Sequence, residues 1–244
     1  MSMTEDLSRA IREDAEPREI QLGEKKYTTA QVFPVKECEP PTLTVTTLTG
    51  LVDYIQANVD KHELSALLCH VENPDSVRLY SALIGDHSQR FCYIQAQNNQ
   101  LHIPLNTFIP AEQFNILIQS CFTEPENRAH ATDRGLVLKY SGNVKTVHEG
   151  VLQDDGVTQI GTVKNGIASV GDEPMPNPVT LCPFRTFMEV EQPSSQFVFR
   201  ARNDEDRGVL FSLVEADGGA WKSEAMRSVK AFMEAQVPGL NVIA

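Results

Sequence analysis

The sequence lacks any long apolar run. Its longest apolar stretches, around Leu68 and Leu117, are far shorter than the roughly 18 residues that a membrane span requires. The first residues also lack a basic region followed by an apolar stretch, which a secretory signal would contain. We therefore expect a protein that lies in the cytoplasm and has no membrane partner.

Cysteine pairs and metal-ligand spacings are absent as well. The five cysteines lie far apart, without a C-x-x-C pair or a regular Cys/His spacing. This pattern predicts neither a disulfide framework nor a zinc site, and we expect no cofactor. Most of the cysteines lie among apolar residues, where a reduced cysteine behaves as a small hydrophobe, so we interpret them as core residues. They are Cys38, Cys69, Cys92, Cys121 and Cys182.

Motifs of nucleotide binding and catalysis are not found. The chain has no phosphate loop, no G-x-G-x-x-G dinucleotide motif and no G-x-S-x-G nucleophile elbow, and its six histidines are scattered.

Positive charge is also scarce. The chain has 21 Lys and Arg against 33 Asp and Glu, a net charge of −12, so it would repel a phosphate backbone. We expect a non-enzymatic, acidic protein that does not bind nucleic acid.

The composition supports a folded protein, since 41% of the residues are hydrophobic. Residues 1–17 are charged and weakly apolar and end at Pro17, which predicts a short helix on a flexible N-terminal arm. We expect residues 18–244 to form a single domain. The alternative is that this domain is divided by a sub-boundary near residue 142.

Apolar periodicity predicts the main elements. Helical spacing predicts helices over residues 47–59, from Pro110 to before Pro125, and over residues 220–236. Alternating patterns and turn signals predict hairpins over residues 18–35 and 197–213, and a meander with strands at 65–71, 76–84 and 90–97. Further strands are expected at 144–152, 157–163 and 179–190, whereas residues 132–140 fit either a strand or a short helix ended by Gly142. The predicted fold class is α+β, with antiparallel sheets, a few packed helices, and a β-rich second half ending in a C-terminal helix.

Two arginines are candidates for ligand binding. Arg185 and Arg200 lie among aromatic residues, where a guanidinium group can bind a carboxylate or phosphate through two hydrogen bonds. The alternative is an internal ion pair, with Glu189, Glu191 or Glu215 as the partner.

The segment that leads into the last helix contains two more candidates. Backbone N–H groups after Asp217 could hold an anion at the start of the helix, although glycines in this position more often let a strand turn into a helix, with Asp217 as the cap. Trp221, the sole tryptophan, is interpreted as a core anchor rather than a surface for ligand stacking.

A hairpin between two predicted strands contains residues of the kinds that ligate metal ions. His148 lies close in sequence to Asp154 and Asp155, and imidazole and carboxylate groups suit divalent ions. Because Asp-Asp-Gly is already explained by a turn, we predict no metal there.

Several segments carry a resemblance to a known family. They are TLTGLVDYI at 47–55, DDGVTQ at 154–159, NPV at 177–179 with PFRTF at 183–187, and EADGGAWK at 215–222. From about Thr42 onward the sequence resembles a family of uncharacterised phage and prophage proteins related to the YfdQ-like proteins. The resemblance implies a phage-encoded protein that works inside a bacterial host cell. It implies no activity, ligand or catalytic residue.

Two functions remain open at this point. The first is a phage accessory protein that assembles with itself, into an oligomer or a shell-like structure, or binds a host or phage protein. The second is an enzyme or small-ligand-binding protein with a pocket around Arg185, Arg200, His148 and Asp154. The absence of catalytic signatures favours the first.

Overall fold

The structure of the protein is a computed structural model that describes residues 4, 6–7, 19–22, 25–28, 41–84, 88–99, 101–125, 132–143, 150–154, 159–163, 177–204 and 206–244. Residue contacts divide the chain into two units, residues 1–40 with 85–87 and residues 41–84 with 88–244. Most of the expected arm at residues 1–17 lies outside the described residues, so the arm stays a prediction. The sub-boundary near residue 142 also stays a prediction.

The described residues of the first unit include a hairpin. Strands β1 (Glu19–Leu22) and β2 (Lys25–Thr28) pair in antiparallel fashion, as the sequence predicts.

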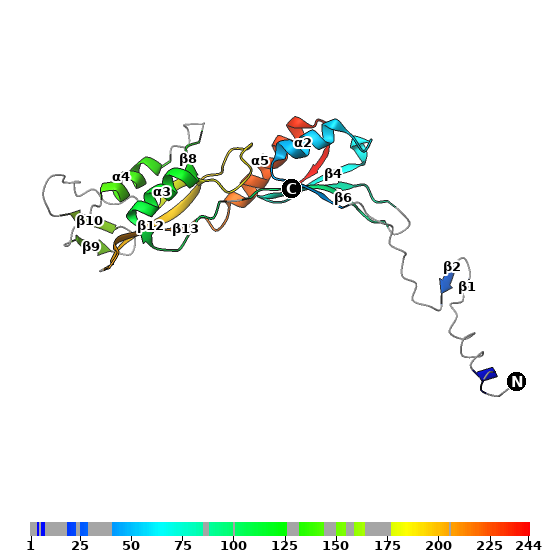
Figure 1. Ribbon diagram of the computed structural model, residues 1–244, viewed down its shortest axis with the longest axis horizontal. Helices are drawn as coiled ribbons and strands as arrows, with labels where there is room; N and C mark the ends of the chain where they lie inside the picture. The colour runs from blue at the N-terminus through cyan, green and yellow to red at the C-terminus, as the bar shows by residue number, and fades with distance from the viewer. Residues whose placement is uncertain are drawn as a thin grey trace. The chain divides into compact units, whose positions relative to one another are not determined.

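A five-stranded sheet begins the second unit (Figure 1). Strands β4 (Leu67–Asn73), β5 (Ser76–Ser81) and β6 (Cys92–Gln97) form the predicted antiparallel meander, and a short 3₁₀ helix, η1 (Leu64–Ala66), precedes β4. Two short edge strands complete the sheet. The first, β3 (Leu43–Val45), is parallel to β6, and the second, β14 (Asn241–Ile243), is parallel to β4. Neither edge strand is expected from the sequence.

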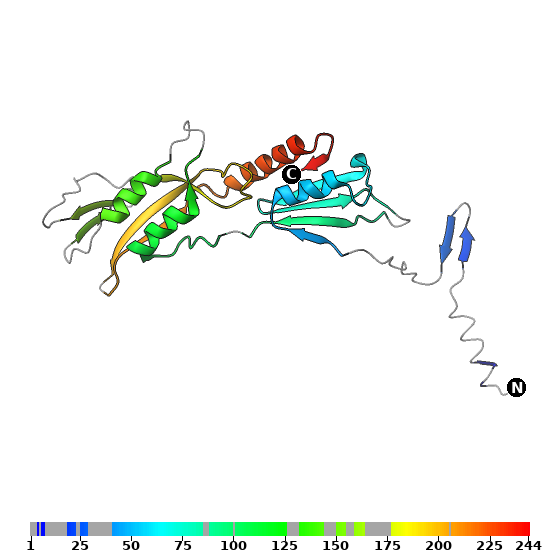
Figure 2. The ribbon, with the colours of Figure 1, turned by 45° about the horizontal axis from the view of Figure 1, so that its top comes forward.

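Two helices cover the same face of this first sheet (Figure 2). They are α2 (Leu48–Ala57) and α5 (Trp221–Gln236), both predicted. Helix α2 begins as its sequence indicates, because the Thr47 side chain accepts a hydrogen bond from the Gly50 backbone N–H at 3.1 Å. Helical spacing places Leu51 and Ile55 of α2, and Val229 and Met233 of α5, in the apolar core above the sheet.

A second five-stranded sheet is antiparallel throughout. Its order is β7 (Ile109–Pro110), β13 (Gly208–Glu215), β12 (Ser195–Asp204), β11 (Val179–Pro183) and β8 (Phe122–Thr123). The long hairpin of β12 and β13 confirms the predicted one. The extended segment predicted over residues 179–190 is wrong beyond Pro183, because residues 184–194 form a loop.

Helices α3 (Ala111–Cys121) and α4 (Arg134–Asn143) pack on the second sheet and complete its own apolar core. Phe114 of α3 stacks on Phe199 of β12, with ring centroids 5.5 Å apart. The segment that fitted either a strand or a helix is therefore helical, and it continues past Gly142. Strands β9 (Gly150–Asp154) and β10 (Gln159–Val163) form a separate antiparallel pair, in the two regions where strands were predicted.

The fold class is α+β, as predicted, and the C-terminal helix is followed by strand β14. Cys69, Cys121 and Cys182 are buried, Cys92 is half-buried, and these four thiols are free. Cys38 lies outside the described residues. Among the described residues, no helix is long and apolar enough to cross a membrane.

Candidate functional site

Arg185 lies in a buried cluster. It follows β11, and its side chain is 8% exposed. Its guanidinium group forms an ion pair with Glu215 of β13, donates a hydrogen bond to Ser195 Oγ, and lies 3.9 Å from the ring centroid of Trp221. Burial lowers the pKa of Arg185, and the hydrogen bond to Glu215 opposes that shift. Of the three acidic partners that the sequence offered, Glu215 forms the internal ion pair.

Asp217 and Trp221 lie beside this cluster. Asp217 Oδ1 accepts a hydrogen bond from the Gly219 N–H at 2.9 Å, and Gly218 and Gly219 adopt positive φ angles of 63° and 82°. The glycines therefore form the turn from β13 into α5. Trp221 is 8% exposed and packs against Arg185, which agrees with a core anchor. Its Nε1–H is buried with no hydrogen-bond partner in the described part of the chain.

The remaining predicted site residues lie elsewhere. Arg200 pairs with Ser212 in the β12–β13 hairpin, and strand alternation places it on the face opposite to Phe199 and the apolar core. Asp154 is the last residue of β9, whose backbone alone is described. His148 and Asp155 lie outside the described residues. The structure thus brings Arg185, Asp217 and Trp221 together, and it places Arg200 on another surface.

The first sheet has a face that the sequence analysis missed. We call the side of this sheet away from α2 and α5 the open face. Its side chains alternate with those of the apolar core along each strand. They include Leu68, His70 and Glu72 of β4, Ser76, Arg78 and Tyr80 of β5, Gln95 and Gln97 of β6, and Asn241 and Ile243 of β14.

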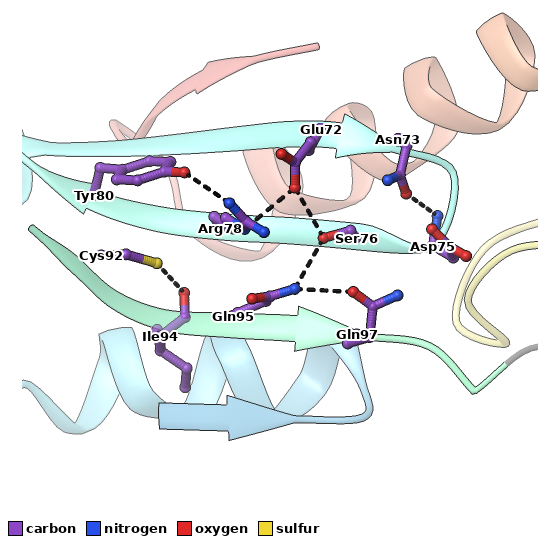
Figure 3. Close-up of polar contacts among 10 residues, drawn as sticks. All are labelled: Glu72, Asn73, Asp75, Ser76, Arg78, Tyr80, Cys92, Ile94, Gln95 and Gln97. Carbon is purple, nitrogen blue, oxygen red and sulfur yellow. Dashed lines mark hydrogen bonds and ion pairs between the residues drawn. The ribbon is translucent and has the colours of Figure 1, made fainter. Parts of the chain in front are cut away.

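A polar network runs across the open face (Figure 3). Glu72 Oε2 lies 3.2 Å from Arg78 Nε and accepts a hydrogen bond from Ser76 Oγ at 3.3 Å. Gln95 Nε2 donates to the same Ser76 Oγ at 3.3 Å and to Gln97 Oε1 at 2.9 Å.

The network continues to Tyr80, whose hydroxyl accepts from Arg78 Nη1 at 3.5 Å. This hydrogen bond, with the nearby Glu72 carboxylate, raises the pKa of Arg78 above its ordinary value. The side chains across three strands are therefore held in place by one another. The sequence signal for this face is the set of polar residues that alternate with apolar ones, at 70 and 72 in β4, at 76, 78 and 80 in β5, and at 95 and 97 in β6.

In comparisons with known proteins, no protein-family model matches this chain, and no curated protein or solved structure matches it either. In the described ranges of the chain, no three His, Cys, Asp or Glu side chains are grouped so that they could hold a metal ion.

Proposed function

We propose that the protein is a phage-encoded, non-enzymatic accessory protein that assembles with further copies of itself through the open face. The resemblance to phage and prophage proteins supports its origin in a phage and its place inside a bacterial host cell. The polar network of the open face is the observation that supports assembly. The oligomer is proposed to be closed and symmetric, either a ring or a larger shell-like structure.

Charge favours a second copy at this face. Two chains of net charge −12 repel each other over most of their surfaces. On the open face, however, Glu72 and Arg78 are present together, and the neighbouring strand contributes the neutral amides of Gln95 and Gln97. A two-fold contact can place Glu72 of each copy against Arg78 of the other, because the same patch serves both subunits. Ile243, which is 47% exposed, adds apolar area to this face.

The alternative function, a ligand pocket around Arg185, has less support. The guanidinium group already has a carboxylate partner in Glu215 and an aromatic partner in Trp221. A ligand carboxylate would have to displace Glu215, whose side chain is 29% exposed, from its ion pair with a guanidinium group that is 8% exposed.

The oligomeric mass tests the proposal. Light scattering of the full-length protein at micromolar concentration should give the mass of several chains. Ile243→Glu places an extra negative charge on the open face and should lower that mass. Ile116→Glu is the matched control, because Ile116 is 59% exposed on α3, which packs on the other sheet, and this variant should keep the wild-type mass. A monomeric wild type, or an unchanged mass for Ile243→Glu, would contradict the proposal.

The N-terminal arm supplies a second, independent test. Because residues 1–17 are charged and weakly apolar in sequence, we expect them to bury little against their own domain and to be able to contact a neighbouring copy. Deleting them should reduce the measured mass. If the mass stays the same, the arm takes no part in assembly.

A further inference from the structure

A groove with acidic walls shares no residue with the open-face network. It consists of two hollows of about 420 Å³ and 140 Å³, which share Pro125, Glu191 and Gln192. Glu124 and Glu189 also line the larger hollow, and Glu224 of α5 lines the smaller one. We call the two hollows together the acidic groove. Its volume falls in the range of sites that bind small molecules or side chains, about 300–1,000 Å³.

The walls of the acidic groove are fixed by hydrogen bonds. Gln192 Oε1 accepts from the backbone N–H of Arg185 at 2.9 Å, and Gln192 Nε2 donates to the carbonyl of Phe187 at 2.9 Å. Glu189 Oε1 accepts from the Thr49 N–H at 3.1 Å and from Thr49 Oγ1 at 3.3 Å. Because the loop is held at both places, a ligand would lose little free energy in ordering it.

The charge of the acidic groove selects a cationic ligand. Four carboxylates line it, and no lysine or arginine is among the described residues of either hollow. Carboxylates collected in a hollow focus their potential and raise the local concentration of cations. None of the described carboxylates belongs to a group of three that could hold a metal ion. An organic cation therefore suits the described carboxylates better than a compact metal ion.

Apolar side chains define the rest of the ligand. Phe184, Met188 and Val190 line the larger hollow together with the carboxylates. Arginine and lysine bury their aliphatic stems along apolar surface and keep the charged end near polar groups. Arginine suits carboxylates better, because its planar guanidinium group forms two parallel hydrogen bonds with one carboxylate.

We propose that the acidic groove binds an extended segment of a partner protein that carries arginine at two alternate positions. In an extended chain, alternate side chains point to the same side, so two arginines can enter the two hollows. Their guanidinium groups bind the carboxylates of Glu124 and Glu191, and their stems pack against Phe184 and Val190. This site goes beyond self-assembly, because it gives the assembled protein a partner.

Calorimetric titration of the full-length protein with the capped peptide Ala-Arg-Ala-Arg-Ala tests the proposal. The peptide should bind at low ionic strength, and replacing both arginines by citrulline should weaken binding about tenfold or more, because the charged hydrogen bonds are lost. The double variant Glu124→Gln/Glu191→Gln should weaken the binding of the arginine peptide to the same extent.

The control variant Glu63→Gln/Glu234→Gln removes the same number of charges from exposed positions that do not line the acidic groove, and it should bind as the wild type does. Equal binding by the two double variants would show that net charge alone attracts the peptide, and it would overturn the proposal. No binding of the peptide would overturn it as well. If 1,4-diaminobutane binds as tightly as the peptide, the groove is a small-amine site and the partner segment is rejected.

Discussion

Arg185→Ala should destabilise the protein strongly. The substitution removes an ion pair with Glu215, a hydrogen bond to Ser195 and a contact with the Trp221 ring. A desolvated cation–π contact contributes about 2 kcal/mol, and a hydrogen bond to a charged group contributes about 1.5–3 kcal/mol. Because Glu215 is 29% exposed, water can solvate its carboxylate once Arg185 is removed, so we expect the free energy of unfolding to fall by about 3 kcal/mol, the low end of the cost of breaking a buried ion pair.

Urea unfolding followed by far-ultraviolet circular dichroism measures this loss. Circular dichroism is preferred to fluorescence, because Arg185 contacts the sole tryptophan and its removal changes the emission directly. Arg185→Met is the informative companion, since an apolar side chain of similar length fills the space and avoids the cost of burying a charge, so it should be less destabilising than alanine. A loss below about 1 kcal/mol for Arg185→Ala, the value typical of exposed ion pairs, would refute the interpretation of a buried structural cluster.

Three further predictions follow from the cores, the turns and the thiols. Phe199→Ala should lower the free energy of unfolding in urea by about 3–5 kcal/mol, because the buried ring stacks on Phe114 and Phe211. A loss below about 1 kcal/mol would contradict this packing. Gly239→Ala should lower the free energy of unfolding by about 1 kcal/mol or more in the same assay, because φ is 91° there. The loss comes from the backbone and not from a clash, since the nearest atom to a new Cβ, Leu64 Cδ2, is 3.6 Å away. Burial raises the pKa of Cys69 from 9.0 to about 12 and that of Cys182 to about 11. The folded state holds these thiol protons more tightly than the unfolded state does. Their contribution to stability is therefore complete below pH 9.0 and is lost as the pH rises towards 11–12. Urea unfolding midpoints that do not fall over this pH range would contradict the prediction.

Local patterns were sufficient to predict much of the fold. The apolar spacing of Leu48, Leu51 and Ile55, with Thr47 as the cap, defines α2 without help from distant residues. The same is true of the β12–β13 hairpin, whose alternation and turn lie within one short segment. Strands β3 and β14 have three residues each, too few to show alternation, and their partners β6 and β4 lie far away in the sequence. Such strands exist because of tertiary pairing.

The candidate site was less predictable for a similar reason. Arg185 and Arg200 both have aromatic neighbours in the sequence, but the face on which each side chain lies decides its role. Arg185 is enclosed by Glu215 and Trp221, whereas strand alternation directs Arg200 away from the Phe199 side. The sequence could name Glu215 among three partners, but choosing it required the fold.

The parallel pairing of β14 with β4 has a consequence for how the chain folds during synthesis. The first core combines residues of α2 and β4–β6 with residues of α5 and β14, while most of the second core lies between them in the sequence. Along the sequence, the second sheet therefore lies between the two parts of the first sheet; it is nested in this sense. On a ribosome, the nested sheet can complete its core while the surrounding one still lacks a helix and an edge strand. Until α5 and β14 emerge, β4 exposes both its apolar face and its unpaired edge, and this interval is when the nascent protein is most exposed to aggregation.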